Sequence, residues 1–390
     1  MKVFVIAGEP SGDALGGALM EGLRVLAPEV TFDGVGGPAM QEQGLSSRFD
    51  MSELSLMGLV EILPKYAHLK RRVREMATAV VNTQPDVLIT IDSPDFCLRV
   101  ADIVRGQCKV PCVHYVAPSV WAWRPKRAQK MSHSVDHVLA LLPFEPPYME
   151  AAGMTCDFVG HPIATASQAD AAQIGMFRAQ FAPGASPLIL ALPGSRKSEV
   201  TRLSPVFADS LKRVCAQHPG ARVVVPAAAP VASLVRDLVA SWPGDPIVLD
   251  PRGRDPELVR AEKLAAFGAA DVALAASGTV SLELAAAQTP MVIAYDMNWL
   301  SRKVISRMLQ VDTVTLVNLV SETRAVPEFI GADCRAELIA PAIEAVLQAP
   351  EAQDAAMALT MQRLGQGGEA PGLRAARSVL AHLNHLDRGT

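Results

Sequence analysis

The sequence predicts an α/β protein made of two doubly wound parallel sheets. Three observations support this: the length, the composition, and a repeated alternation of strand-like and helix-like sequence patterns. A chain of 390 residues is longer than a typical single domain, since domains usually hold roughly 100 to 200 residues. Half of the residues are hydrophobic and 19% are charged, which supplies the apolar side chains that buried parallel strands need. We therefore expect two domains facing a cleft.

Short runs rich in β-branched residues, separated by longer helical patterns, predict the strands of both sheets. In the first half these runs are 2–7, 87–91, 111–116 and 135–141. After residue 170 they are 187–192, 222–226, 272–275 and 291–294. The small and polar stretch 164–172 is typical of a linker. We predict domains at 1–165 and 166–340, and C-terminal helices at 341–390 that pack across domains or subunits.

Composition excludes several other classes of protein. The net charge of −4 lacks the basic excess of a protein that binds a polynucleotide, so we expect no nucleic acid partner. Six cysteines without C-x-x-C spacing predict reduced core residues and no zinc site. An early charged turn argues against a signal peptide, and no apolar run reaches the ~20 residues of a membrane span. We expect a cytoplasmic protein whose membrane contact is peripheral.

Residues 8–13, with the sequence Gly-Glu-Pro-Ser-Gly-Asp, follow the first predicted strand and are expected to open a helix at Ala14. Two carboxylates would repel a phosphate but suit sugar hydroxyls, from which they accept hydrogen bonds. An ordinary capped turn is the alternative. The candidates for an acceptor site here are Glu9, Ser11, Gly12 and Asp13.

Two carboxylates, Asp92 and Asp95, follow the predicted strand 87–91, at the edge of the sheet where open α/β folds bind ligands. Either residue could instead cap the next helix. Asp95 is the better candidate for a general base, because Pro94 restrains the backbone before it and Phe96 could exclude water.

The loop 114–124 concentrates aromatic and basic residues. Trp121, Trp123 and Arg124 predict an acceptor platform with a phosphate contact, and core packing with salt bridges is the alternative.

Two strand-to-helix loops of the second domain predict a diphosphate site. Arg196 closes the loop after strand 187–192, and Ser277, Gly278 and Thr279 form the loop after strand 272–275. Backbone N–H groups there can cradle a diphosphate that Arg196 neutralises, while Glu283 accepts hydrogen bonds from ribose hydroxyls. No Mg²⁺ is then required, and we expect no metal or other cofactor.

The segment 58–74 joins an apolar stripe to a run of basic residues that includes Lys70, Arg71 and Arg72. Anionic membranes attract this combination, although a solvated helix face is the commoner reason for it.

Taken together, these motifs resemble those of the lipid-A-disaccharide synthase family. The matching segments run in order at 8–13, 57–61, 91–96, 114–123, 142–145, 158–162, 193–196 and 277–279. The resemblance implies a GT-B fold with two Rossmann-like domains. It implies an inverting glycosyltransferase that condenses UDP-2,3-diacylglucosamine with 2,3-diacylglucosamine 1-phosphate (lipid X), forms a β-1,6 bond and releases UDP.

The resemblance also assigns roles to residues. Asp95 matches the essential aspartate, Arg196 and Glu283 match donor-site positions, and Asn318 matches another, although Val317 stands where the family usually has proline. Association with the inner membrane and a homodimer that exchanges its C-terminal helices are further implications. Alternatives are another GT-B enzyme, such as a UDP-N-acetylglucosamine epimerase, and a non-catalytic nucleotide-sugar-binding module. A dinucleotide-dependent oxidoreductase fits less well, because neither glycine loop has the required spacing.

Overall fold

The computed structural model describes residues 1–54, 59–123, 126–184, 186–297 and 311–388. The side chains of 59–66, 122–123 and 387–388 are outside this description. The chain divides into two compact units, Met1–Thr165 with Leu364–Thr390, and Ala166–Arg363. The predicted third segment, 341–390, is therefore shared between the two units.

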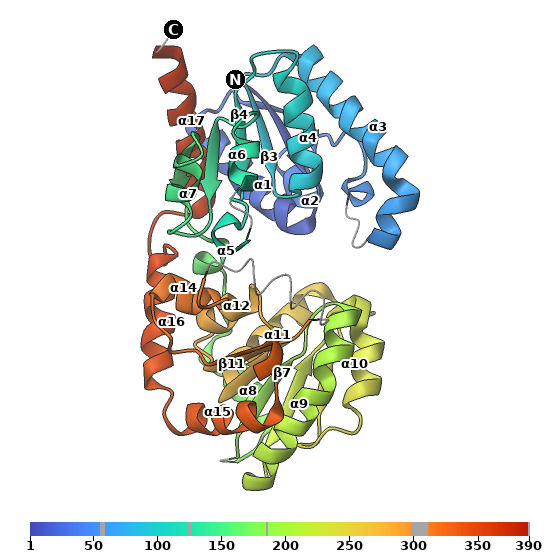
Figure 1. Cartoon of the computed structure of the whole chain (residues 1–390), viewed down its shortest axis with the longest axis vertical. Coiled ribbons are helices and arrows are strands. Elements are labelled where there is room, and N and C mark those ends of the chain that lie inside the picture. Colours follow the sequence, from blue (N-terminus) through green and yellow to red (C-terminus); the bar gives the residue numbers. More distant parts are fainter. Residues whose placement is uncertain (55–58, 124–125, 185, 298–310, 389–390) are drawn as a thin grey trace. The chain divides into compact units, whose positions relative to one another are not determined.

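The first unit holds a parallel sheet whose order among the described residues is β2-β1-β3-β4-β5-β6. Figure 1 labels its neighbouring strands β3 and β4. Its strands are β1 (Lys2–Ala7), β2 (Thr31–Val35), β3 (Val87–Ile91), β4 (Cys112–Tyr115), β5 (His137–Ala140) and β6 (Thr155–Phe158). Its helices are α1 (Pro10–Leu26), α2 (Pro38–Glu42), α3 (Leu59–Thr83), α4 (Pro94–Arg105), α5 (Val120–Trp123), α6 (Lys126–Met131), α7 (Pro146–Glu150) and α17 (Pro371–Arg388). Short 3₁₀ turns lie at Met51–Glu53 and Pro162–Thr165.

Alternate side chains of β1 are buried on opposite faces of this sheet, because helices cover both faces. Phe4 and Ile6 pack in one core with residues of α3 and α4. Val3 and Val5 pack in the other core with α1 and α17. Such two-sided burial makes each inner strand an almost continuous apolar run, the pattern that predicted the central strands.

The last helix, α17, completes the first unit by lying against α1. Glycines allow the two backbones to approach closely: a Cβ on Gly372 would lie 2.4 Å from the Ala18 carbonyl oxygen, and one on Gly22 would lie 2.7 Å from the Gly372 oxygen. The side chains of Ala375 and Ala376 are fully buried in this contact. The C-terminal helix is thus part of the first unit's core.

The second unit repeats the architecture, with the described strand order β12-β11-β10-β7-β8-β9, all parallel. Its strands are β7 (Leu188–Leu192), β8 (Arg222–Pro226), β9 (Ile247–Leu249), β10 (Val272–Ala275), β11 (Met291–Tyr295) and β12 (Glu328–Ile330). Its helices are α8 (Ala171–Phe181), α9 (Lys197–Gln217), α10 (Ala232–Val239), α11 (Pro256–Ala269), α12 (Val280–Ala286), α14 (Leu316–Ser321), α15 (Ala336–Gln348) and α16 (Glu351–Arg363). Short 3₁₀ turns lie at Ala229–Val231 and Gly331–Asp333.

The predicted α/β class with two doubly wound parallel sheets and a helical C-terminus is confirmed. Two helix starts were placed too late. The first helix begins at Pro10 rather than Ala14, and α9 begins at Lys197 rather than near Glu199. In α1 the early start follows from proline, whose fixed φ suits the first helical turn.

Candidate active site

Asp95 lies just beyond the carboxyl end of β3, in the first turn of α4. The chain reaches it through Asp92 and Ser93, which both have left-handed backbone conformations, with φ of 50° and 40°. Such conformations are uncommon for residues other than glycine and concentrate at functional sites. The sharp turn leaves the Asp95 side chain 96% exposed, with the Arg127 guanidinium 3.9 Å from its Oδ1 atom.

A cavity of about 690 Å³ lies beside Asp95. One part of its wall is apolar and comprises Leu54, Leu69, Val73, Phe96 and Ile103. Charged side chains of both signs also line it: the cations Lys70, Arg74 and Arg99, and the carboxylates Glu9, Asp95 and Asp102. A cavity with this lining suits a ligand that has both an apolar part and hydrogen-bonding groups.

The segment 8–13 divides into residues near this cavity and residues that support the fold. Glu9 lines the cavity, and Ser11 is exposed at the start of α1. Gly12 is buried, and a Cβ there would lie 3.4 Å from the Ile91 carbonyl oxygen. That distance is an ordinary van der Waals contact, so the packing of α1 on β3 would also accommodate a Cβ at this position.

Asp13 has a structural environment, in contrast to its predicted contact with sugar hydroxyls. Its carboxylate is buried and accepts hydrogen bonds from the backbone N–H groups of Gly37 (2.8 Å), Ala39 (3.0 Å) and Met40 (3.1 Å). These contacts stabilise the amino end of α2, where N–H groups lack partners within the helix. Backbone N–H groups therefore occupy the carboxylate that was expected to accept hydrogen bonds from sugar hydroxyls.

Trp121 is also a packing residue, so its predicted role as an open platform is corrected. It is 8% exposed, contacts Phe144 edge to face at 5.2 Å, and donates from Nε1 to Glu145 Oε1 over 3.4 Å. Burial raises the pKa of Glu145 to about 7. The side chain of Trp123 and the whole of Arg124 lie outside the described residues.

The structure brings the two predicted donor loops together at one edge of the second sheet. Strands β7 and β10 are neighbours in register, with Leu192 opposite Ala275, so the loops that follow them leave the sheet side by side. Arg196 stands at the amino end of α9 with its side chain 67% exposed. Open space surrounds Gly278, whose φ is 146°, and Ser277 and Thr279 flank it. This arrangement can hold an anion between an arginine and backbone N–H groups.

Each charged donor-site candidate already has a partner within the unit. Arg196 Nη1 lies 2.9 Å from Glu199 Oε1, and Lys263 Nζ lies 2.5 Å from Glu283 Oε2. The contact from Lys263, twenty residues earlier in the chain, had no signal in the sequence.

Asn318 is 1% exposed, and its side chain holds a turn rather than facing a ligand surface. Its Nδ2 donates to the Val326 oxygen and to Glu328 Oε1, both over 2.9 Å, and its Oδ1 accepts from Val326 N. These bonds fix the chain before β12. Direct contact between Asn318 and the donor, as the resemblance implied, is therefore not supported by this geometry.

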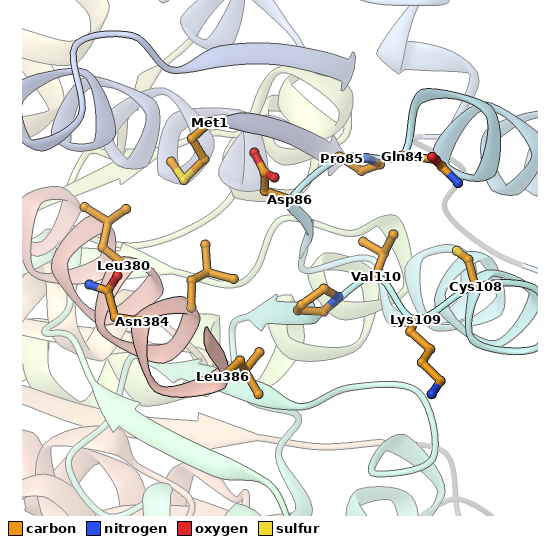
Figure 2. Close-up of a pocket in the computed structure, with 12 residues that line it drawn as sticks. Met1, Gln84, Pro85, Asp86, Cys108, Lys109, Val110, Leu380, Asn384 and Leu386 are labelled. Carbon is orange, nitrogen blue, oxygen red and sulfur yellow. The ribbon is translucent and has the colours of Figure 1, made fainter. Parts of the chain in front are cut away.

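A separate cavity of about 530 Å³ lies at the opposite, amino edge of the first sheet (Figure 2). Met1, Asp86 and Pro111, which immediately precede β1, β3 and β4, line it together with Leu380 and Leu383 of α17. This cavity lies at the amino end of β3, whereas Asp95 follows the carboxyl end of the same strand. It therefore does not belong to the candidate active site.

No group of three or more His, Cys, Asp or Glu side chains among the described residues is placed to hold a metal ion. None of the described helices has the length and apolar character needed to cross a membrane.

Comparison with known proteins decides the family. A family model described as lipid-A-disaccharide synthetase matches residues 3–378. The chain belongs to the lipid-A-disaccharide synthase family. A lipid-A-disaccharide synthase of Ruegeria pomeroyi is 64% identical over 383 residues, covering 98% of this chain and 96% of the relative. One from Rhodospirillum centenum is 46% identical over 387 residues, covering 97% and 94%.

Solved structures with a similar fold support the two-domain architecture. A UDP-GlcNAc 2-epimerase from Neisseria meningitidis superposes with a TM-score of 0.63 at 12% identity, covering 99% of this chain and all of the other. Acinetobacter baumannii MurG superposes with a TM-score of 0.53 at 12% identity, covering 98% and 99%. The chain thus has the GT-B fold, and as a lipid-A-disaccharide synthase family member it is a glycosyltransferase of lipid A biosynthesis.

Proposed function

We propose that this family member transfers 2,3-diacylglucosamine from its UDP donor to lipid X, with inversion, giving a β-1,6-linked disaccharide 1-phosphate and UDP. The observation that carries the proposal is the exposed Asp95 carboxylate beside a cavity whose wall is partly apolar and partly made of charged side chains of both signs. An acylated, phosphorylated sugar matches that lining. The first unit is then the acceptor and catalytic domain, the second is the donor domain, and the C-terminal helices serve both.

In the proposed reaction Asp95 removes the proton of the acceptor 6-hydroxyl as its oxygen attacks the anomeric carbon of the donor. The bond from that carbon to the UDP oxygen breaks, and negative charge grows on the diphosphate. Arg196 and the N–H groups of Ser277 to Thr279 stabilise that charge, as preorganised donors do in other transferases. Glu283, held by Lys263, accepts from the ribose hydroxyls.

The direct test incubates the purified protein with both diacylated substrates and measures UDP and disaccharide. UDP release that requires the acceptor supports transfer. Conversion of a UDP-sugar to its 2-epimer without acceptor would favour the alternative that this protein is an epimerase. A UDP-GlcNAc 2-epimerase has a similar fold. Binding of UDP with neither product would favour a non-catalytic module.

The donor site yields a prediction about affinity. Arg196→Ala and Glu283→Ala should each weaken UDP binding roughly ten- to a hundredfold, because each removes a charge-assisted contact that contributes about 1.5 to 3 kcal/mol. Calorimetric titration with UDP measures this. Arg213→Ala is the matched control. Arg213 lies in α9, the helix that Arg196 precedes, and it pairs with Glu337 on the surface. Unchanged UDP affinity in both folded variants would remove Arg196 and Glu283 from the donor site.

Peripheral membrane contact through the basic part of α3 is a second component of the proposal. The apolar stripe 59–63 has side chains outside the described set, but the cations beyond it are described. Arg72 pairs with Glu53 (2.8 Å) and stacks on the Phe49 ring, so it serves the fold. The exposed residues Lys70, Arg71 and Arg74 are the better membrane candidates.

Changing Lys70, Arg71 and Arg74 together to glutamine should reduce cosedimentation with anionic liposomes at low salt. Each cation near an anionic surface contributes about 1 kcal/mol. Neutral liposomes, to which the triple variant and the original protein should bind alike, are the control. Equal binding of both proteins to anionic liposomes would contradict the membrane role of these residues. Exchange of C-terminal helices in a homodimer stays a prediction.

A further inference from the structure

A second, smaller cavity adjoins Asp95 between α4 and α6, with a volume of about 120 Å³. Three cations, Arg99, Arg127 and Lys130, line it with the carboxylates of Asp95 and Asp102. The lining thus carries one more positive than negative charge. A compact anion would be attracted to this cavity, whereas the 690 Å³ cavity has the space and the apolar wall for a chain.

A buried hydroxyl also lines the small cavity and has no evident structural use. Ser134 follows α6 and is 1% exposed. Within the part of the chain that the structure describes, its Oγ has no hydrogen-bond partner. Buried polar atoms are nearly always paired, so an orphaned hydroxyl at a cationic cavity points to a ligand oxygen.

The spacing along α4 relates this cavity to the proposed reaction. Asp95 and Arg99 line both cavities and are one helical turn apart, which places their Cβ atoms about 5–6 Å from each other. That separation is comparable to the width of one sugar ring. A hexose with its 6-hydroxyl at Asp95 can therefore direct a substituent on its anomeric carbon toward Arg99.

We propose that the small cavity binds the phosphate monoester of the acceptor sugar, while the acyl chains lie along the apolar wall of the larger cavity. This inference rests on the proposed function, because it takes Asp95 as the group that meets the 6-hydroxyl. Lys130, Arg127 and Arg99 contact the phosphate, and Ser134 donates its hydroxyl to a phosphate oxygen. Binding the phosphate here fixes which acceptor hydroxyl faces Asp95.

The test compares two acceptors that differ only in the phosphate, 2,3-diacylglucosamine 1-phosphate and 2,3-diacylglucosamine. UDP release is measured in mixed micelles at saturating UDP-2,3-diacylglucosamine. Lys130→Met and Ser134→Ala should each raise KM for the phosphorylated acceptor roughly tenfold, and leave KM for the other acceptor within about twofold. Ser134→Ala removes no hydrogen bond that the described residues make, so it should fold normally. Lys126→Met, on the same short helix but not among the residues that line the cavity, should change neither KM.

Three outcomes would overturn the inference while leaving the proposed function in place. The original enzyme could use both acceptors equally well. The Lys130 and Ser134 variants could lose the same factor with both acceptors. Arg74→Gln, in the larger cavity only, could carry the phosphate-selective loss instead. By contrast, absence of UDP release by the original enzyme with either acceptor would overturn the proposed function itself.

Discussion

Asp95→Asn is expected to lower kcat by about 10² to 10⁴-fold, because removal of a proton by a positioned base typically contributes that much to the rate. Asparagine preserves the shape of the side chain but does not accept the proton of the acceptor hydroxyl. Affinity for UDP should stay unchanged, since the proposed UDP site lies in the other unit. Initial rates at saturating acceptor, with calorimetric UDP titration, measure both expectations.

Asp92→Asn is the matched control for this prediction. Asp92 is three residues away, half-buried, and in a left-handed backbone conformation that asparagine also adopts readily. We expect it to retain most of the activity. If Asp92→Asn loses turnover while Asp95→Asn keeps it, Asp92 is the base. If both variants fold and both retain turnover, the base lies elsewhere, and Glu9 on the same cavity is the next candidate.

Gly372→Val is expected to reduce the free energy of unfolding of the first unit by about 3 kcal/mol. The new side chain would begin 2.4 Å from the Ala18 carbonyl oxygen, and helix backbone has little freedom to move away, so α17 must separate from α1. Urea denaturation measures the loss of stability. Hydrogen exchange should show the faster opening concentrated in α17 and α1.

Gly175→Val in α8 is the matched control, because a Cβ at Gly175 would have no atom within 4 Å. Both changes place valine at a helical glycine, and the control should shift stability by less than about 0.5 kcal/mol. Equal effects of the two substitutions would show that helix propensity, and not the contact between α1 and α17, sets the response.

The sequence predicted the centre of each sheet and missed its edges. All eight predicted runs contain strands, and they occupy the inner positions of the two sheets. The four missed strands, β2, β6, β9 and β12, are the four edge strands. In three of them a polar residue, Asp33, Asp157 or Glu328, interrupts the apolar run that identifies a buried strand. The fourth, β9, is apolar but only three residues long.

The candidate site was predictable where a residue's role depends on its place in the chain. Asp95 and the two donor loops follow strands, and the carboxyl ends of parallel strands share one edge. Asp13, Trp121 and Asn318 differ, because their hydrogen-bond partners come from residues 5 to 27 positions away that no local pattern identifies. Lys130 and Ser134 were not predicted for the same reason. They line one cavity with residues of α4 only because of the tertiary packing.

The position of α17 has a consequence for the order in which this protein can fold during synthesis. The ribosome completes residues 1–165 first and then makes roughly 200 residues of the second unit before α17 emerges, which at typical elongation rates takes about 10 to 40 s. Throughout that interval the α1 surface that α17 will cover, including Gly22, remains open. The second unit, by contrast, is one uninterrupted stretch of chain and can fold as soon as it leaves the ribosome. The half that is synthesised first is therefore the half that finishes last.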